Sequence, residues 1–344
     1  RGRVDPTAGL VHLDGLSLSD AELKEINRVC IVACGTAWHA GLVTRYFIER
    51  LANVQVDIEY GSEFRYRTPI LDRRTLFVVI SQSGETADTL GSLNLAAELG
   101  ARTLAICNVV GSTMTRKAES VIYTHAGPEI SVASTKAFVT QLTAGFLLAL
   151  KLGAVKGRLS PVALTEHIDA LVHLPAQIER SLDCDSQIQK VVKHYGSTDH
   201  DFLFLGRGIL YPIALEGALK MKELSYIHAE GYPAGEMKHG PIALISEDTP
   251  VVAVIGHDGV NYEKTLSNLM EVAARGGKII AVTDRTTAEL KNIAWEIMEV
   301  GAAPSLMLPI VLTPPLQLLS YHMAVYRGTD VDQPRNLAKS VTVE

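Results

Sequence analysis

The sequence predicts two α/β domains in tandem, each built on a doubly wound parallel sheet with helices on both faces. Three observations support this prediction. Short, continuously apolar runs alternate with longer helical patterns, as is typical of strands buried in parallel sheets. The same order of strand, glycine-containing turn and helix occurs twice, about 170 residues apart. The 344 residues are also enough for two domains, each with its own core.

In the first half, the strand Val29–Ala33 precedes a turn at Cys34–Thr36 and a helix over 38–51. Further strands are expected at Val54–Ile58, Leu76–Ile80, Thr103–Cys107 and Val121–Thr124. The apolar stretch 137–152 includes Lys151 and is too short and polar to span a bilayer. We therefore expect a buried helix there and no association with a membrane.

In the second half, Phe202–Leu205 is the expected strand, Gly206–Gly208 the turn and 212–230 the helix. More strands are expected at Val251–Ile255, Lys278–Val282 and Ile297–Val300, and a helical stretch over 164–192 should link the halves. The expected organisation is an N-terminal linker over 1–20, a first domain over 21–160, a helical linker over 161–195, a second domain over 196–328 and a polar tail over 329–344. The composition of the tail favours fraying, although a tail could also fold over a site.

Charge and cysteine usage narrow the class of protein. The net charge is −6 and no basic block is present, which argues against a nucleic-acid partner. The cysteines are Cys30, Cys34, Cys107 and Cys184, and they form neither a CxxC pair nor a metal-binding pattern with histidine. Reduced thiols in a cytoplasmic protein are expected, with no bound metal. No signal peptide is visible, and the start at Arg1 suggests a piece of a longer chain.

A hydroxyl-rich turn with the sequence Ser-Gln-Ser-Gly-Glu-Thr occupies positions 81–86, between a predicted strand and a predicted helix. The helix dipole, backbone N–H groups and the hydroxyls of Ser81, Ser83 and Thr86 could converge on one phosphate there. The alternative is an ordinary helix cap. A second cluster, Ser131–Lys136, is either another capping segment or the opposite wall of a phosphosugar pocket.

Three charged residues of the second half, Glu216, Lys220 and Glu223, share one face of the predicted helix. They could form an exposed ladder of ion pairs. Alternatively, a carboxylate base beside an ammonium group could move a proton between adjacent carbons of a sugar. His239 follows in a Lys-His-Gly-Pro segment and could transfer protons near neutral pH, although a loop histidine is often simply solvated.

Seven segments of the chain together carry a resemblance to a known family. They are CGTAWHAG (34–41), GSEFRYR (61–67), SQSGETADT (81–89), EISVASTKAF (129–138), ALEGALKMKELSYIHAE (214–230), GEMKHGP (235–241) and DVDQPRNLAKSVTVE (330–344). In order and content they resemble the sugar isomerase half of glutamine-dependent glucosamine-6-phosphate synthases, also called glutamine–fructose-6-phosphate aminotransferases. The C-terminal segment is specific to that family and is not shared with sugar isomerase domains generally.

The resemblance implies two tandem sugar isomerase (SIS) domains that bind fructose 6-phosphate, form glucosamine 6-phosphate for UDP-N-acetylglucosamine biosynthesis and need no cofactor. By motif match, the residues that bind substrate are Thr36, Ser81, Gln82, Ser83, Thr86, Val132, Ser134 and Ala338.

The same match implies the catalytic roles. Glu223 would shuttle a proton between C1 and C2, with Lys220 as its electrostatic companion. His239 would open the sugar ring in the site of a neighbouring subunit, so a homodimer with shared active sites is expected. Lys339 would form a Schiff base with the open-chain ketose, which requires a neutral amine, and the tail would then cover the pocket.

The sequence departs from the family in two places. Ala37 stands where some relatives have serine, so no side-chain hydrogen bond is expected there. The family's glutaminase half, with its cysteine nucleophile, is not in this sequence. This chain is therefore not expected to extract ammonia from glutamine by itself, and the resemblance implies that the glutaminase domain supplies it. The competing interpretations are a stand-alone sugar-phosphate isomerase and a phosphosugar-sensing module. A sensing module would need neither the base nor the lysine, and no DNA-binding segment is evident.

Overall fold

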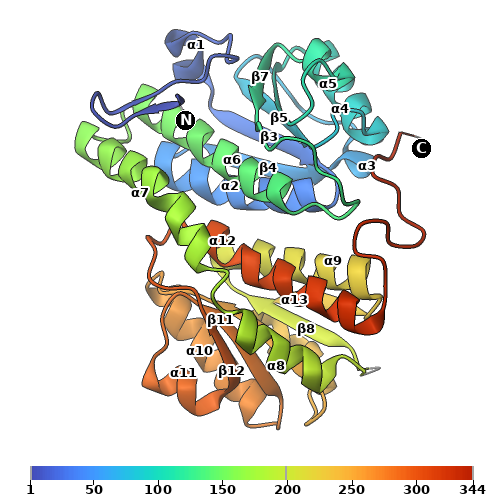
Figure 1. The fold of residues 1–344 in the computed structure, drawn as a ribbon. Coiled ribbons are helices and arrows are strands. Elements are labelled where there is room, and N and C mark those ends of the chain that lie inside the picture. Colours follow the sequence, from blue (N-terminus) through green and yellow to red (C-terminus); the bar gives the residue numbers. More distant parts are fainter. Residues whose placement is uncertain (1, 198–199, 343–344) are drawn as a thin grey trace. The chain divides into compact units, whose positions relative to one another are not determined.

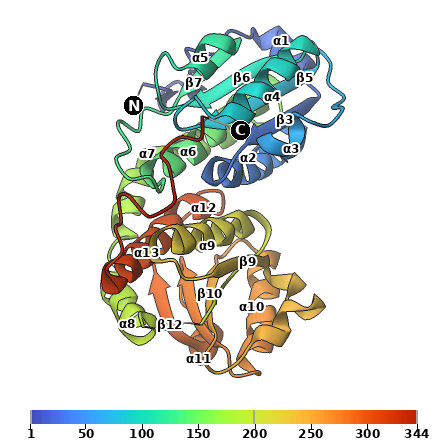
Figure 2. The same ribbon diagram turned by 90° about the vertical axis from the view of Figure 1, so that its right-hand side faces the viewer.

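The computed structural model describes residues 2–197 and 200–342, which form two α/β units (Figures 1 and 2). The described residues of 1–130, 134–172 and 338–344 form unit 1, whereas those of 131–133 and 173–337 form unit 2. The boundary falls inside helix α7 (Pro161–Arg180), after Val172. The C-terminal tail therefore contributes residues to both units.

Unit 1 contains a five-stranded parallel sheet with the strand order β4-β3-β5-β6-β7. The strands are β3 (Arg28–Ala33), β4 (Gln55–Tyr60), β5 (Thr75–Ser81), β6 (Arg102–Cys107) and β7 (Ser120–Tyr123). The chain adds β4 on one side of β3 and then β5, β6 and β7 on the other side, so the strand order changes direction beside β3. In sheets of this kind, ligands bind at the carboxyl ends of the strands near this point.

Helices cover both faces of this sheet (Figure 2). On one face α2 (Thr36–Ala52) packs against α6 (Lys136–Val155). The other face carries α3 (Gly61–Phe64), α4 (Ala87–Glu98) and α5 (Thr113–Lys117). Among the described residues, α6 alone is long and apolar enough to cross a membrane, and 67% of its apolar window is buried inside the protein. Such burial is also typical of a core helix.

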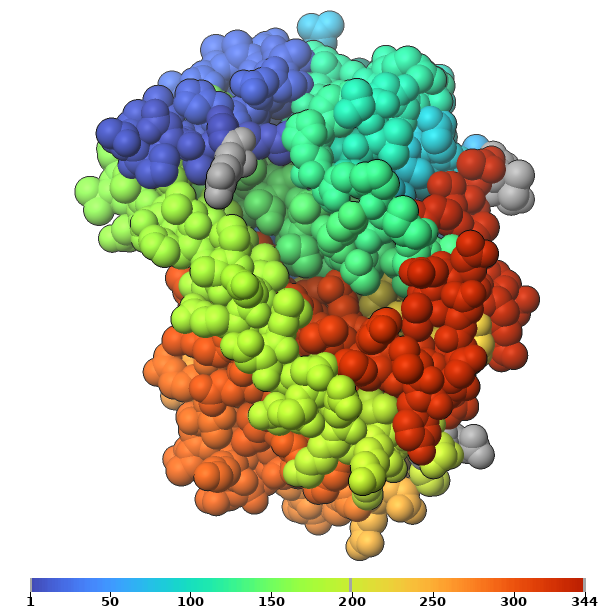
Figure 3. Space-filling model, in the orientation of Figure 1, coloured from blue at the N-terminus to red at the C-terminus, as the bar shows by residue number. Residues whose placement is uncertain are grey.

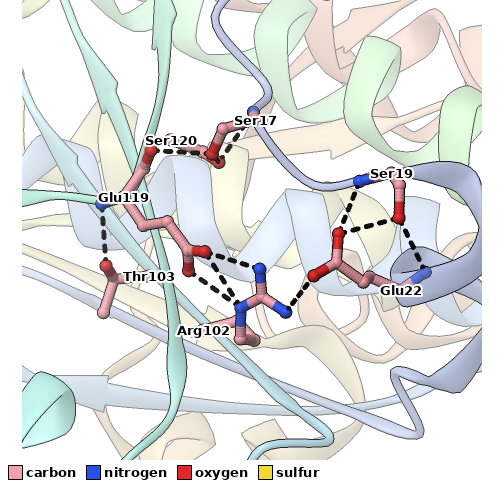
Figure 4. Close-up of polar contacts among 7 residues, drawn as sticks. All are labelled: Ser17, Ser19, Glu22, Arg102, Thr103, Glu119 and Ser120. Atoms are coloured by element: carbon pink, nitrogen blue, oxygen red, sulfur yellow. Dashed lines mark hydrogen bonds and ion pairs between the residues drawn. The ribbon is translucent and has the colours of Figure 1, made fainter.

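The N-terminal segment forms a short hairpin, β1 (Val4–Asp5) with β2 (Leu10–Val11), followed by α1 (Asp20–Glu25). Arg102 at the start of β6 links this segment to the sheet (Figure 4). Its guanidinium donates to Glu22 of α1 at 2.8 Å and to both carboxylate oxygens of Glu119. Ser19 and Glu22 complete a capping box at the start of α1.

Unit 2 repeats the architecture with the strand order β12-β11-β10-β8-β9, again parallel throughout. Its strands are β8 (Phe202–Gly206), β9 (Ala229–Pro233), β10 (Pro250–Ile255), β11 (Lys278–Thr283) and β12 (Ala294–Glu299). One face packs against α10 (Val260–Ala273), α11 (Ala288–Ile293) and η2 (Ala234–His239). The remaining helices are α8 (Asp185–Tyr195), η1 (Gly208–Leu210), α9 (Tyr211–Ser225), η3 (Pro241–Leu244), α12 (Leu308–Val311) and α13 (Thr313–Arg327).

The predicted fold class is confirmed, because both halves are doubly wound parallel sheets. The helix predicted over 212–230 is wrong beyond Ser225. Tyr226 adopts a left-handed conformation (φ 60°) that ends α9, and Ala229–Pro233 then pairs with β8 as an edge strand. This strand reads Ala-Glu-Gly-Tyr-Pro and has no continuous apolar run to reveal it. Three smaller differences were also found. The single helical stretch expected over 164–192 is two helices, α7 and α8. Thr36, expected in a turn, already belongs to α2, and the strand expected from Ile297 begins at Ala294 as β12.

Candidate active site

The loop after β5 is held in place by its own hydroxyl groups. The Oγ of Ser81, which is 4% exposed at the end of the strand, accepts the Gly84 N–H at 3.0 Å. The Oγ of Ser83 accepts the Glu85 N–H at 3.2 Å. A hydroxyl that accepts one hydrogen bond can still donate its own proton, so both groups keep a donor for a ligand. Gly84 has φ 69°, and a β-carbon there would lie 2.1 Å from Ser112 Oγ.

The start of α4 lies beside this loop but is partly occupied. The helix begins at Ala87, and the N-cap residue Thr86 makes no capping bond through its side chain. The Ala87 N–H donates to the carbonyl of Val341 in the tail at 3.2 Å. One backbone donor expected for a phosphate is therefore taken by the tail, and the hydroxyl groups and the helix dipole still favour an anion.

The carboxylate of Glu85 braces the same loop against the next helix. Its Oε1 accepts the Thr113 N–H at 2.7 Å, and this backbone hydrogen bond lowers the pKa of Glu85. The charged side chain is thus directed at the start of α5. It thereby links the loop after β5 to the helix after β6.

The two units differ at the turn that follows their first parallel strands, β3 and β8. The sequence predicted the same glycine-containing turn at both places. Gly35 and Gly208 both have φ 55°. A β-carbon built on Gly35 meets no heavy atom of the described residues within 4 Å, whereas one on Gly208 lies 2.9 Å from the side-chain nitrogen of Asn261. The end of the first strand is therefore open in unit 1 and filled in unit 2.

The loop after β10 is the counterpart in unit 2 of the loop after β5. It also contains a left-handed glycine, Gly259, with φ 84°. Asp258 precedes that glycine at the position that Ser83 holds in unit 1, and His257 pairs with Asp284 at 3.0 Å. A carboxylate at this position repels an anion, so this loop of unit 2 is a poorer candidate for an anion site than the loop after β5.

Glu129 caps helix α6 and was missed by the sequence analysis. The side chain is 9% exposed, and its carboxylate accepts the Ala137 N–H at 2.9 Å, the Thr135 Oγ1 hydrogen at 3.0 Å and the Ser134 hydroxyl at 3.4 Å. The positive end of α6 is thus occupied by a carboxylate of the protein itself. An acidic residue a few positions before a hydroxyl run and a long helix is the signal that could have found it.

The neighbouring residues of this segment hold the tail. The Val132 N–H donates to the Asp332 carbonyl at 2.9 Å, and the Ser131 hydroxyl donates to the Val331 carbonyl at 2.9 Å. The tail is therefore fixed by hydrogen bonds, and the fraying favoured by its composition is wrong for the described residues up to 342. It lies at the surface (Figure 3).

Helix α9 buries the predicted row of charges, which excludes an exposed ion-pair ladder. Glu216 and Lys220 are each 1% exposed, and the side chain of Glu223 is 21% exposed. The Lys220 Nζ lies 3.6 Å from Glu216 Oε1 and forms a short hydrogen bond with Glu223. Burial disfavours the charge on Lys220, but the two carboxylates outweigh this effect and raise its pKa. A permanent ammonium thus stands beside the one partly accessible carboxylate.

The predicted site residues are divided between the two units. Unit 1 contains Thr36, Ser81, Gln82, Ser83, Thr86, Ser134, Ala338 and Lys339, whereas unit 2 contains Val132, Lys220, Glu223 and His239. His239 ends η2 as an exposed residue, and Lys339 is half-buried in the tail. Among residues 2–197 and 200–342, no group of three histidine, cysteine or acidic side chains is arranged to hold a metal ion.

Comparison with known proteins shows which family this chain belongs to. A model of the SIS domain matches residues 22–151 and 198–327. The C-terminal domain of glucosamine-fructose-6-phosphate aminotransferase from Francisella tularensis is 42% identical, with a TM-score of 0.89 over 96% of this chain and 95% of that chain. The chain belongs to the isomerase (SIS) domains of the glutamine–fructose-6-phosphate aminotransferase family.

Other members of this family match the whole chain. Glutamine–fructose-6-phosphate aminotransferase [isomerizing] from Chlorobaculum tepidum is 49% identical over 345 residues, covering 100% of this chain and 56% of the relative. The enzyme of the same name from Methanosarcina acetivorans is 49% identical over 343 residues and is covered to 55%. The chain thus spans about half the length of these relatives. Glucosamine-6-phosphate deaminase from Thermotoga maritima, with 23% identity and a TM-score of 0.74, shows the fold alone.

Proposed function

We propose that this chain binds fructose 6-phosphate and converts it to glucosamine 6-phosphate by ketose–aldose isomerisation. Ammonia would come from a glutaminase domain of the full-length protein, and the product would feed UDP-N-acetylglucosamine biosynthesis. The names of the relatives and the 56% coverage support this assignment to the isomerase half. The four free cysteines, three of them buried, fit the reducing cytoplasm.

The phosphate is assigned to the loop after β5. The hydroxyls of Ser81 and Ser83 each accept a backbone N–H and keep an O–H to donate, and Thr86 stands at the start of α4. Gln82 lies between them. Donors that converge beside a helix N-terminus suit a phosphate. Thr36, Val132, Ser134 and Ala338 would line the sugar, as the family motifs imply.

The observation that carries the proposed chemistry is the buried row of charges in α9. An ammonium fixed by two carboxylates is costly to bury and adds nothing to simple recognition of a phosphosugar. It suits proton transfer, because it places a positive charge beside the carboxylate of Glu223, which would move a proton between C1 and C2. This feature favours an enzyme over a sensing module.

Two further side chains complete the proposed reaction. The exposed His239 at the end of η2 would open the sugar ring in a neighbouring subunit, so the active form would be a homodimer. The neutral amine of Lys339 would attack the ketose carbonyl, and its oxygen would leave as water to give the imine. Both roles rest on the family motifs that these residues match.

Substitution of Glu223 by glutamine tests the proposed base. Glu223→Gln keeps the shape of the side chain and removes its basicity, so we expect unchanged fructose 6-phosphate affinity in calorimetry and a loss of turnover of about a hundredfold or more. Isomerisation in deuterated water, read by label incorporation, measures the step itself. The control Glu263→Gln removes an exposed carboxylate of α10 and should leave both quantities unchanged. Normal label incorporation in Glu223→Gln would assign the base elsewhere.

A further inference from the structure

The carboxylate of Glu129 accepts hydrogen bonds from four donors at the start of α6, all within unit 1. Its Oε2 accepts the Ala137 N–H at 2.9 Å and the Ser134 hydroxyl hydrogen at 3.4 Å. Its Oε1 accepts the Thr135 N–H at 3.3 Å and the Thr135 hydroxyl hydrogen at 3.0 Å. An ionised carboxylate only accepts hydrogen bonds, whereas the amide of glutamine would turn its NH₂ group toward two of these donors. This position therefore requires a carboxylate.

The chain that leads to Glu129 is fixed by the side chain of Asn108, which follows β6. Its Oδ1 accepts the Thr124 hydroxyl hydrogen at 3.0 Å and the Ala126 N–H at 2.8 Å. Its Nδ2 donates to the Gly127 carbonyl at 2.8 Å, two residues before Glu129. Glu129 is thus held by a bonded turn on one side and by α6 on the other, so its carboxylate is preorganised.

This carboxylate also determines the direction of the Ser134 hydroxyl. A serine hydroxyl has one proton to donate and lone pairs that accept. Beside an ionised carboxylate the proton points to the carboxylate, because the opposite orientation would set the lone pairs of two oxygens against each other. Ser134 is half-buried, and the lone pairs of its Oγ remain to accept a hydrogen bond from a ligand.

We propose that Glu129 is a positioning residue that presents the Oγ of Ser134 to the sugar as a hydrogen-bond acceptor. This inference rests on the proposed function, which places Ser134 beside the sugar. The sugar group that meets Ser134 is then a hydroxyl, which has a proton to donate, and not the ketose carbonyl, which only accepts. Glu129 itself touches no reacting atom in this scheme.

A double-mutant cycle separates this role from the capping of α6. Ser134→Ala should weaken fructose 6-phosphate binding about fivefold, the usual effect of one hydrogen bond. Glu129→Gln should weaken it about two- to fivefold, because the Ser134 proton is no longer held by a carboxylate. In the Ser134→Ala background, Glu129→Gln should leave the affinity unchanged, since the hydroxyl through which it acts is gone. The loss of thermal stability caused by the weaker cap should remain in both backgrounds.

Calorimetry on the full chain measures these affinities. Inorganic phosphate, which lacks the sugar, reports on the loop after β5 alone, and its binding should be the same in all variants. Glu22→Gln is the matched control, because Glu22 also caps a helix with its carboxylate. It pairs with Arg102 at the start of β6, at the opposite edge of the parallel sheet from the carboxyl ends of the strands. The control should lower stability without changing either affinity.

Fluorinated analogues test the direction of the bond, because fluorine cannot donate a proton. Each analogue is fructose 6-phosphate with one hydroxyl group replaced by fluorine. One of them should bind the wild-type chain about fivefold more weakly than fructose 6-phosphate does, the effect of one lost donor. In Ser134→Ala this difference should disappear.

Two results would overturn the inference. An unchanged fructose 6-phosphate affinity in Glu129→Gln, or an equal loss in both backgrounds, would mean that Glu129 acts only as a cap. Analogues whose losses of affinity are the same in the wild type and in Ser134→Ala would mean that the sugar donates no hydrogen bond to Ser134. If Glu129→Gln does not fold, Glu129→Asp takes its place in the cycle, because it keeps the charge and withdraws the carboxylate from Ser134.

Failure of the proposed function would be visible in the wild-type chain itself. A wild-type chain that binds inorganic phosphate but not fructose 6-phosphate would overturn the proposed function, and this inference with it. A wild-type chain that binds the sugar phosphate, with variants that show no coupling between Glu129 and Ser134, would overturn this inference alone.

Discussion

At the scale of single residues, two hydroxyl groups decide where the phosphate is expected. The double substitution Ser83→Ala and Thr86→Ala removes two candidate donors and keeps the backbone of the loop. We expect fructose 6-phosphate binding to weaken by about 1 to 3 kcal/mol, the scale of hydrogen bonds to a charged group. Isothermal calorimetry measures this change.

Asn261 in the first turn of α10 in unit 2 offers the control. Asn261→Ala changes the residue that fills the end of the first strand there, and it should leave the affinity for fructose 6-phosphate as it was. An unaltered affinity in the double variant, together with a normal thermal transition, would place the phosphate away from the loop after β5.

The position of a residue on a helix face was more predictable than its burial. The spacing of Glu216, Lys220 and Glu223 correctly placed them on one face, since helical periodicity is local. Their burial was not predictable, because it depends on which elements pack against α9, and one of these, α13, lies about a hundred residues further along the chain. Glu129 was missed for the same reason: its bonds to the start of α6 depend on how the intervening loop turns.

At the scale of secondary-structure elements, strands buried on both faces were predicted within a few residues, because a continuous apolar run is their direct consequence. Strand β9 was missed since it lies at the edge of its sheet and carries Glu230 and Tyr232 instead of such a run. The end of α9 depends on the left-handed Tyr226, a conformation that tyrosine rarely adopts and that no pattern announces.

The attachment of α1 to the sheet of unit 1 should depend on pH. Hydrogen bonds from Ser19 and then from Arg102 lower the pKa of Glu22 to about 2, from the usual 4.5. A lowered pKa in the folded state means that Glu22 contributes stability above about pH 4.5, and that this contribution disappears as the pH falls toward 2. The bond between Glu22 and Arg102 should therefore weaken in acid (Figure 4).

Glu22→Gln tests this expectation. The variant should be less stable than the wild type at pH 7, and the difference in urea midpoint should shrink as the pH is lowered through the range from 4.5 to 2. Glu25→Gln changes an exposed carboxylate of the same helix outside this network and serves as the control. A constant difference between Glu22→Gln and the wild type at all pH values would show that the ionisation of Glu22 does not stabilise the fold.

At the scale of the whole molecule, the two halves share a fold but have diverged in chemistry. Unit 1 keeps an open strand end at Gly35 and a hydroxyl loop, whereas unit 2 fills the same place with Asn261 and carries Asp258 in its loop. Unit 2 contains the buried charges of α9 instead. Duplication thus supplied two similar scaffolds, and the proposed function assigns phosphate binding to one and proton transfer to the other.

Shared active sites in a homodimer give the last prediction. If His239 acts in the site of the neighbouring subunit, the variants His239→Ala and Glu223→Gln should each be inactive alone. A mixed dimer contains one site with both defects and one site with neither, so mixing the two variants should restore isomerisation to at most about half the wild-type level per mixed dimer. The assay follows isomerase activity after subunit exchange, with exchange verified by mass spectrometry on differently tagged chains. Two His239→Ala chains that differ only in their tags form the control and should stay inactive. Verified mixed dimers without activity would mean that each site takes both side chains from the same subunit.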